Sequence, residues 1–289
     1  MRGTTAKLTA FAAALALVFV GALLIGGAVG PLRDRDAAAA PAHGDGMGEM
    51  GGAHGEGGHG APRAVRGLGV EEGGLSIRLA TTTAPAGRTQ PLRFRIVDAD
   101  GATVKDFDVE HTKRLHLIVV RRDLTGFQHL HPTQGADGEW SVPLRLTEPG
   151  TYRVFADFSH EGTPRTLAND LQVDGAVHSV PVPPPAPVAE VDGLKVALAA
   201  GDAGAGEETA LDFTVTRGGR PVALADYLGA KGHLVALRQG DLAFLHVHPD
   251  EDSLRFMATF PSVGRYRLFL QFKTGGRLHT VAFTHEVES

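Results

Sequence analysis

From residue 68 onward, the chain consists of short runs rich in Val, Leu and Phe that are separated by Gly, Pro and Asp. Such runs, bounded by turn-forming residues, are typical of β-strands, and no amphipathic helix is predicted outside the N-terminus. About seven strands in about 100 residues predict an immunoglobulin-like sandwich, and the pattern occurs twice. The predicted strands lie near 75–82, 91–98, 115–120, 127–131, 140–146, 151–158 and 166–173, and then near 194–199, 210–216, 233–237, 244–248, 254–260, 265–272 and 279–287.

The two halves of this pattern are copies of one another. Residues 113–132 and 230–249 align without a gap and share a His-Leu pair, an arginine, a phenylalanine and a closing His-x-His-Pro. Further on, the segment Gly150–Phe155 matches Gly264–Phe269. A period of about 115 residues is too long for a solenoid repeat and suits a duplicated domain.

We therefore expect an all-β protein with two tandem immunoglobulin-like β-sandwich domains after an N-terminal transmembrane helix. The five parts are an apolar membrane anchor or signal segment, 1–30; a Gly-, His- and Met-rich tether, 31–67; a first sandwich, 68–175; a Pro-rich linker, 176–189; and a second sandwich, 190–289. The tether has too little apolar bulk to fold alone, and the prolines of the linker predict an extended, fairly stiff connection.

The N-terminal segment contains an uncharged run, Leu8–Val29, that follows Arg2 and Lys7. This run is long enough to span a bilayer, and basic residues before it place the N-terminus in the cytoplasm. The alternative is a cleaved signal peptide. Either interpretation predicts that the bulk of the chain is extracytoplasmic, as a single-pass membrane protein or as a secreted one.

Composition removes several kinds of chemistry. The chain has no cysteine, so disulfides, zinc–thiolate sites and thiol catalysis are excluded. The formal net charge of −5 gives no indication of nucleic-acid binding. Each sandwich must therefore be stabilised by its own apolar core.

One histidine spacing occurs in both copies. The first set is His116, His129 and His131, and the second set, 117 positions later, is His233, His246 and His248. If Val120 pairs with Phe127 in a hairpin, paired positions sum to 247 and His116 lies opposite His131. His129 then shares their face, because alternate residues of a strand point the same way. The equivalent sum in the second copy is 481.

Three neutral imidazoles are ligands that suit copper, zinc or nickel. We therefore predict one metal site in each sandwich, with copper preferred over zinc, while a purely structural role for histidines packed beside Ile118, Val120 and Phe127 remains the alternative. The tether contains weaker candidate ligands for a metal ion. An equally supported interpretation is that they occur by chance in a solvated Gly-rich linker. These are His43, Met47, Met50, His54 and His59. By contrast, His111, His178 and His285 are expected at the surface.

The segments Lys113–Leu124, Phe127–Pro132 and Gly150–Phe158 resemble a family of secreted or membrane-anchored bacterial proteins, many of them actinobacterial. The family is similar to YtkA-like β-sandwich domains and, in outline, to periplasmic copper-binding sandwiches of the CopC type. The resemblance implies an extracytoplasmic sandwich and heavy-metal handling. CopC-type proteins bind copper through a free N-terminal group or Met-rich loops, and neither feature occurs in the folded part of this chain.

Two other functions remain open. Paired sandwiches on a stalk could present their loops to a protein partner without any metal. Cupin-like enzymes also use His-x-His on a strand, but the acid that should follow is poorly matched by Glu139 and by Asp250. Because no catalytic signature or cofactor-binding loop is evident, we predict no catalytic residues and no enzyme.

Overall fold

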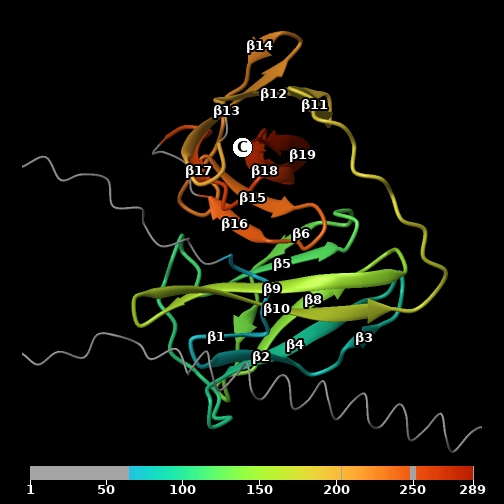
Figure 1. The fold of residues 1–289 in the computed structure, drawn as a ribbon, viewed down its shortest axis with the longest axis vertical. Coiled ribbons are helices and arrows are strands. Elements are labelled where there is room, and N and C mark those ends of the chain that lie inside the picture. The colour runs from blue at the N-terminus through green and yellow to red at the C-terminus, as the bar shows by residue number, and fades with distance from the viewer. Residues whose placement is uncertain (1–64, 203, 248–251, 289) are drawn as a thin grey trace, which may run out of the picture. The chain divides into compact units, whose positions relative to one another are not determined.

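The computed structural model describes residues 65–202, 204–247 and 252–288 (Figure 1). The predicted anchor, most of the tether with its five candidate ligands, and His248 lie outside these ranges. Within them all regular secondary structure is β-strand, as predicted, and no helix is long and apolar enough to cross a membrane.

The first sandwich contains two sheets of five strands each. The first sheet runs, in spatial order, β1 (Glu71–Glu72), β2 (Leu75–Leu79), β4 (Thr89–Val97), β8 (Trp140–Arg145) and β7 (Thr133–Gln134). The second sheet runs β3 (Thr83–Ala84), β10 (Thr163–Val173), β9 (Gly150–His160), β5 (His116–Arg121) and β6 (Gln128–Leu130). All pairs are antiparallel except β3 with β10, which is parallel.

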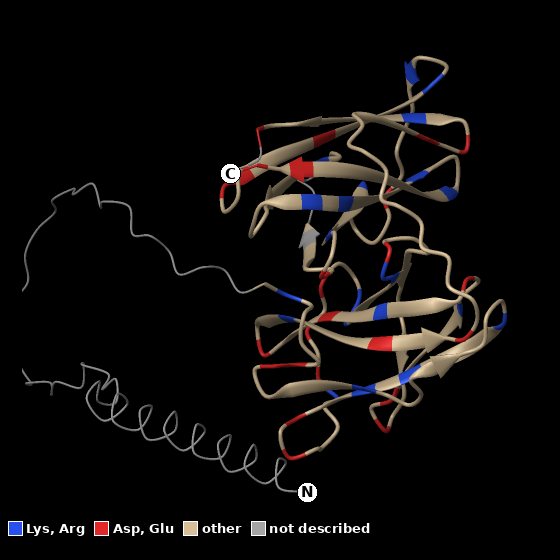
Figure 2. Ribbon diagram, turned by 45° about the vertical axis from the view of Figure 1, so that its right-hand side comes forward, with Lys and Arg blue, Asp and Glu red and all other residues tan. Residues whose placement is uncertain are grey.

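The second sandwich repeats this arrangement. One sheet contains β11 (Val188–Val191), β12 (Leu194–Ala200), β13 (Glu208–Arg217) and β14 (Arg220–Pro221), with β17 (Arg255–Thr259) also paired to β13. The other contains β16 (Phe244–Val247), β15 (Gly232–Arg238), β18 (Gly264–Thr274) and β19 (Arg277–Val287). Charged residues of both signs occur along the strands and turns of both sandwiches (Figure 2).

Each sandwich has its own apolar core, and each core contains a tyrosine at the equivalent position. The Tyr152 hydroxyl donates to the Glu148 carbonyl oxygen at 2.9 Å, and the Tyr266 hydroxyl donates to the Ser262 carbonyl oxygen at 3.0 Å. A tyrosine that bonds back to the chain just before its strand is a feature of immunoglobulin-like sandwiches. The predicted immunoglobulin-like fold and its duplication are confirmed.

A third apolar cluster lies between the sandwiches. Successive residues of β5 point to opposite faces of its sheet. Leu117 and Val119 pack in the interior of the first sandwich, whereas Ile118 and Val120 pack against the second sandwich. The strand is consequently buried on both faces, which explains its unbroken apolar sequence. The shared cluster contains Ile118, Val120, Leu124, Phe155, Ala168, Val235, Leu237, Leu242, Phe244 and Phe269.

Aromatic pairs in this shared cluster follow a pseudo-twofold relation. Phe127 stacks on Phe269 with ring centres 4.1 Å apart, and Phe155 contacts Phe244 at 5.1 Å. In the repeat alignment Phe127 is equivalent to Phe244 and Phe155 to Phe269. The two contacts are therefore the same contact made twice, as at the interface of a symmetric dimer.

The linker is fastened to the first sandwich at its start. Arg121 donates to the His178 carbonyl oxygen at 3.1 Å, and the Val180 N–H donates to the Asp123 carboxylate at 2.9 Å. Arg121 and Asp123 also form an ion pair with each other, and both side chains are largely buried. The chain therefore leaves the first sandwich in a fixed direction.

Candidate metal centre

The histidines of the first set are positioned by the β5–β6 hairpin. The observed pairs are Leu117 with Leu130, Ile118 with His129 and Val119 with Gln128, so paired positions sum to 247 as predicted. In the second hairpin Leu234 pairs with Val247 and Leu237 with Phe244, which gives the predicted sum of 481. The register derived from the sequence is therefore the observed register in both copies.

His116, His129 and His131 converge in space. One nitrogen from each ring can be chosen so that all three atoms lie within 4.8 Å of one another. Their ring centres are 5.3, 5.1 and 4.8 Å apart. Three imidazoles on one tetrahedral ion, with nitrogens about 2.0–2.1 Å from the metal, would have ring centres about 5 Å apart. The ring centres of the cluster therefore have the spacing expected for three imidazoles around one ion.

The hydrogen bonds around two of these rings favour one tautomer of each ring. Nδ1 of His129 lies 2.9 Å from Oε1 of Gln271, and Nε2 of His116 lies 3.3 Å from the Glu110 carbonyl oxygen. Both oxygens are acceptors, so the favoured tautomer carries its ring proton on each of these nitrogens. The remaining nitrogens, Nδ1 of His116 and Nε2 of His129, face each other at 3.0 Å.

Two lone pairs at this separation repel unless a cation lies between them. Outer N–H groups that donate to oxygen acceptors, with inner nitrogens directed at a common point, are also the arrangement found around protein-bound metal ions. The two candidate cations are a proton shared by the rings and a metal ion. His116 and His129 are only 3 % and 7 % exposed, so either cation would be largely removed from water.

The second copy repeats the support of the first histidine. Nε2 of His233 lies 2.9 Å from the Tyr227 carbonyl oxygen, six residues earlier, as Nε2 of His116 lies near the Glu110 carbonyl oxygen. Both carbonyls belong to equivalent turns, closed by an isolated bridge between Glu110 and Lys113 and by another between Tyr227 and Ala230. His233 therefore presents Nδ1, like His116.

His233 does not lie apart from the first set. Its ring centre is 6.4 Å from that of His116 and 6.0 Å from that of His129, and it is 1 % exposed. The two sets were expected to form separate sites, one in each sandwich, but the packing of the sandwiches brings His233 close to the triad. The backbone of His246 pairs with Val235 as predicted, and His248 lies outside the described residues.

The polar groups beside the histidines are also duplicated, with one difference. Asp157 pairs across strands with His116 and accepts a hydrogen bond from Thr166 at 2.7 Å. Gln271 pairs with His233 and donates to the equivalent Thr280 at 3.0 Å. One copy thus has a carboxylate where the other has an amide, and the amide is the group that crosses between sandwiches to His129.

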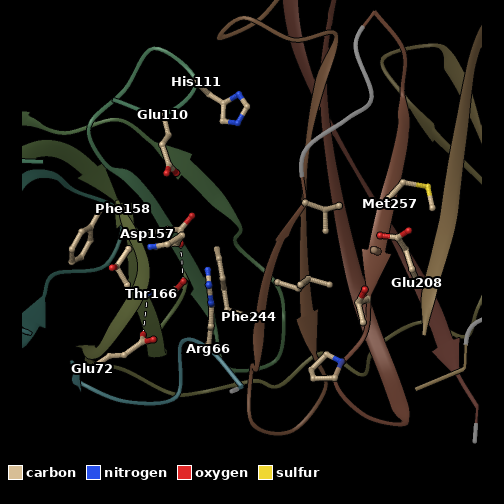
Figure 3. A pocket seen from close by; sticks show the side chains of 17 residues that line it. Arg66, Glu72, Glu110, His111, Asp157, Phe158, Thr166, Glu208, Phe244 and Met257 are labelled. Atoms are coloured by element: carbon tan, nitrogen blue, oxygen red, sulfur yellow. Dashed lines mark hydrogen bonds between the residues drawn. The ribbon is translucent and has the colours of Figure 1, made fainter. Parts of the chain in front are cut away.

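A cleft of about 1100 Å³ borders this cluster and is lined by both sandwiches (Figure 3). Its acidic side chains are those of Glu72, Glu110, Asp157 and Glu208, and Arg66 is a cation among them. His111 also lines the cleft, and its ring centre is 5.9 Å from that of His233.

The surface position expected for His111 is therefore wrong, since the residue is half-buried beside the cluster. It was missed because Leu228 occupies the equivalent position of the second copy, so the repeat gave it no support. His178 is exposed as expected. The surface position expected for His285 is also wrong, since the residue is half-buried, and burial lowers its pKa.

Several solved structures show low-level similarity. The Lin-41 filamin domain is 16% identical and covers 39% of this chain and 98% of its own, with a TM-score of 0.25. The Escherichia coli adhesin FdeC is 16% identical, and the match covers 74% of this chain and 64% of the adhesin chain, with a TM-score of 0.26. Salmonella alpha-2-macroglobulin is 14% identical, and the match covers 78% of this chain and 15% of the macroglobulin chain, with a TM-score of 0.28. The chain thus spans less than two thirds of the adhesin and macroglobulin chains. Scores this low support no conclusion about function.

No curated protein matches the chain. A family described as a domain of unknown function, DUF8832, matches twice, at residues 70–175 and 189–289. It carries neither the YtkA-like nor the CopC-type name expected from the sequence. Because the two matches together cover well over half of the chain, the protein belongs to the DUF8832 family.

Proposed function

We propose that the protein is an extracytoplasmic metal-binding protein, anchored through segment 1–30, whose cargo is a copper ion, with zinc as the alternative. The observation that carries this proposal is the pair of inward nitrogens of His116 and His129, 3.0 Å apart, with both outer nitrogens committed to oxygen acceptors. Nitrogens about 2.0 Å from one ion would be about 3 Å apart, so the spacing suits a metal ion. The divalent copper ion binds nitrogen ligands more tightly than zinc does.

The chemistry of the centre supports binding rather than catalysis. Glu139, on which a cupin-like enzyme would depend, pairs with Arg93 and Arg95 at 3.8 and 3.6 Å and so does not join the triad. The tether histidines and methionines, such as His43 and Met47, would deliver copper to the triad or hold a second pool of it. No nucleic acid is part of this proposal, and a protein partner that exchanges the metal is compatible with it.

The test is titration of the purified intact chain with Cu(II), with Zn(II), and with Cu(I) under reductant, followed by calorimetry. Replacement of His43, His54 and His59 by Ala separates tether binding from binding at the triad. In that background His131→Ala should weaken the high-affinity site at least tenfold, because it removes a ligand, whereas His178→Ala, at an exposed histidine, should change nothing. Bound metal at one hundredfold above Kd should also stabilise the fold by about 2.7 kcal/mol.

The competing function is a metal-free interaction module, in which the histidines have only a structural role. That function requires a shared proton between His116 and His129 in place of the metal. If micromolar Cu(II) and Zn(II) neither bind nor stabilise the chain, or if His131→Ala binds as the parent does, the metal proposal fails and the module is favoured.

A further inference from the structure

We propose that His233 of the second sandwich is the fourth ligand of the ion held by His116, His129 and His131, so that one metal ion joins the two sandwiches. This inference rests on the proposed function and goes beyond it. It replaces two independent sites, one in each sandwich, by a single centre between them. It also assigns that centre a closed coordination shell.

The position of His233 carries the first step. Its ring centre is 6.0 and 6.4 Å from those of His129 and His116, about 1 to 1.4 Å beyond the separation of about 5 Å expected for imidazoles on one tetrahedral ion. Binding of a common ion therefore requires the His233 ring to move toward the other rings. His233 approaches from the side of the second sandwich, so its approach depends on the packing of β15 against β5.

The hydrogen bonds of His233 carry the second step. The Tyr227 carbonyl oxygen, 2.9 Å from Nε2, holds the proton on that nitrogen and leaves the lone pair on Nδ1. Gln271, opposite His233 on β18, already holds His129 in the other sandwich at 2.9 Å. The same short stretch of the second sandwich therefore orients one ligand of the first sandwich and supplies a ligand of its own.

Burial carries the third step. His233 is 1 % exposed, so an ion that it binds would be largely removed from water. Four protein ligands close a tetrahedral site, whereas a catalytic site keeps a position for water. A four-histidine centre would thus retain its ion and would not activate water.

The experiment compares the intact chain with His233→Gln, in the background that lacks the tether histidines. Glutamine can still donate to the Tyr227 carbonyl oxygen but offers no imidazole nitrogen to the metal, and circular dichroism checks that the variant folds. We expect the affinity for Cu(II) and Zn(II), measured by competition with a chelator, to fall about 100-fold or more, since even outer-shell changes cost about 10–100-fold. The exposed His178→Ala variant should match the parent.

Cobalt(II) supplies an independent readout of the fourth position. In the intact chain its visible spectrum should be that of a four-coordinate site and should not respond to azide. In His233→Gln a solvent ligand replaces the imidazole, so azide should alter the spectrum.

Several results would overturn the inference while leaving the proposed function intact. One is an affinity of His233→Gln within twofold of the parent while His131→Ala loses binding. Another is an azide response already present in the parent. A third is a stoichiometry of two in which His233→Gln removes one ion and leaves the other unchanged. If no metal binds at all, the proposed function itself fails.

Discussion

Replacing Phe269 by alanine should uncouple the two sandwiches. Phe269 is 4 % exposed, lies in the shared apolar cluster and stacks on Phe127 of the first sandwich at 4.1 Å with an angle of 5° between the rings. Phe→Ala at a buried site costs about 3–5 kcal/mol, of which about 0.5–1.5 kcal/mol belongs to the aromatic pair itself. With an m-value of about 3 kcal/mol/M in urea, the midpoint should fall by about 1–1.7 M.

The chain offers a probe for each part of this transition. Trp140 is the only tryptophan and lies in the core of the first sandwich, so its fluorescence reports on that sandwich alone, while far-UV circular dichroism reports on both. In the parent the two urea transitions should coincide, because the shared cluster makes the sandwiches unfold together. In Phe269→Ala they should separate, although the substitution lies in the other sandwich.

Phe256→Ala is the matched control for Phe269→Ala. Phe256 is fully buried in the second core but not in the shared cluster, so its loss should lower the midpoint by a similar amount while the two transitions stay together. Transitions that already separate in the parent, or a Phe269→Ala variant with unchanged Trp140 fluorescence transition, would show that the shared cluster does not couple the sandwiches. A Phe127→Ala/Phe269→Ala double-mutant cycle should return about 1 kcal/mol for the stack.

Two further predictions concern the first sandwich. Burial raises the pKa of Asp123, but hydrogen bonds from Arg121, Val180 and Thr125 outweigh it and hold the pKa well below its usual value. Asp123→Asn should therefore lower the free energy of unfolding by about 3 kcal/mol at pH 7, measured by urea denaturation. The difference from the parent should shrink as the pH falls below about 4, because the carboxylate of the unfolded chain takes up its proton first. A difference that does not change with pH would contradict this reasoning. Tyr152→Phe removes the hydrogen bond to the Glu148 carbonyl oxygen and should lower the free energy of unfolding by about 1 kcal/mol in the same assay. Tyr266→Phe is the equivalent variant in the second sandwich and should have a similar effect. No change in either variant would mean that water replaces the lost hydrogen bond.

The strands that could be predicted are those whose own side chains form a core. Alternation along 91–98 or 265–272 records which residues face inward, and β4 and β18 lie there. Two-residue strands such as β1 and β7 could not be predicted, because they are defined only by the neighbour to which they pair. For the same reason β11 begins at Val188, inside the predicted linker: the segment is a strand because β12 lies beside it.

The candidate site divides in the same way. The convergence of His116, His129 and His131 could be derived from hairpin register, because pairing and alternation are local rules. The approach of His233 and the hydrogen bond from His129 to Gln271 could not, because they depend on how two finished sandwiches pack. The sequence did show that Ile118 and Val120 share the face of the histidines. Apolar residues there imply that another surface buries this face, but they do not identify that surface.

The pseudo-twofold packing explains why the surface that buries the histidine face belongs to the second sandwich. A sheet face that carries Ile118, Val120 and Phe155 must be buried, and the duplicate presents the equivalent Val235, Leu237 and Phe269. Under a twofold relation each equivalent contact is made twice, and groups near the axis meet their own counterparts. His116 and His233 are such counterparts, with ring centres 6.4 Å apart. Histidines that are separate in each copy are thereby brought to one place. A tandem chain, unlike a symmetric dimer, can then differ there: Asp157 in one copy is a carboxylate where Gln271 in the other is an amide.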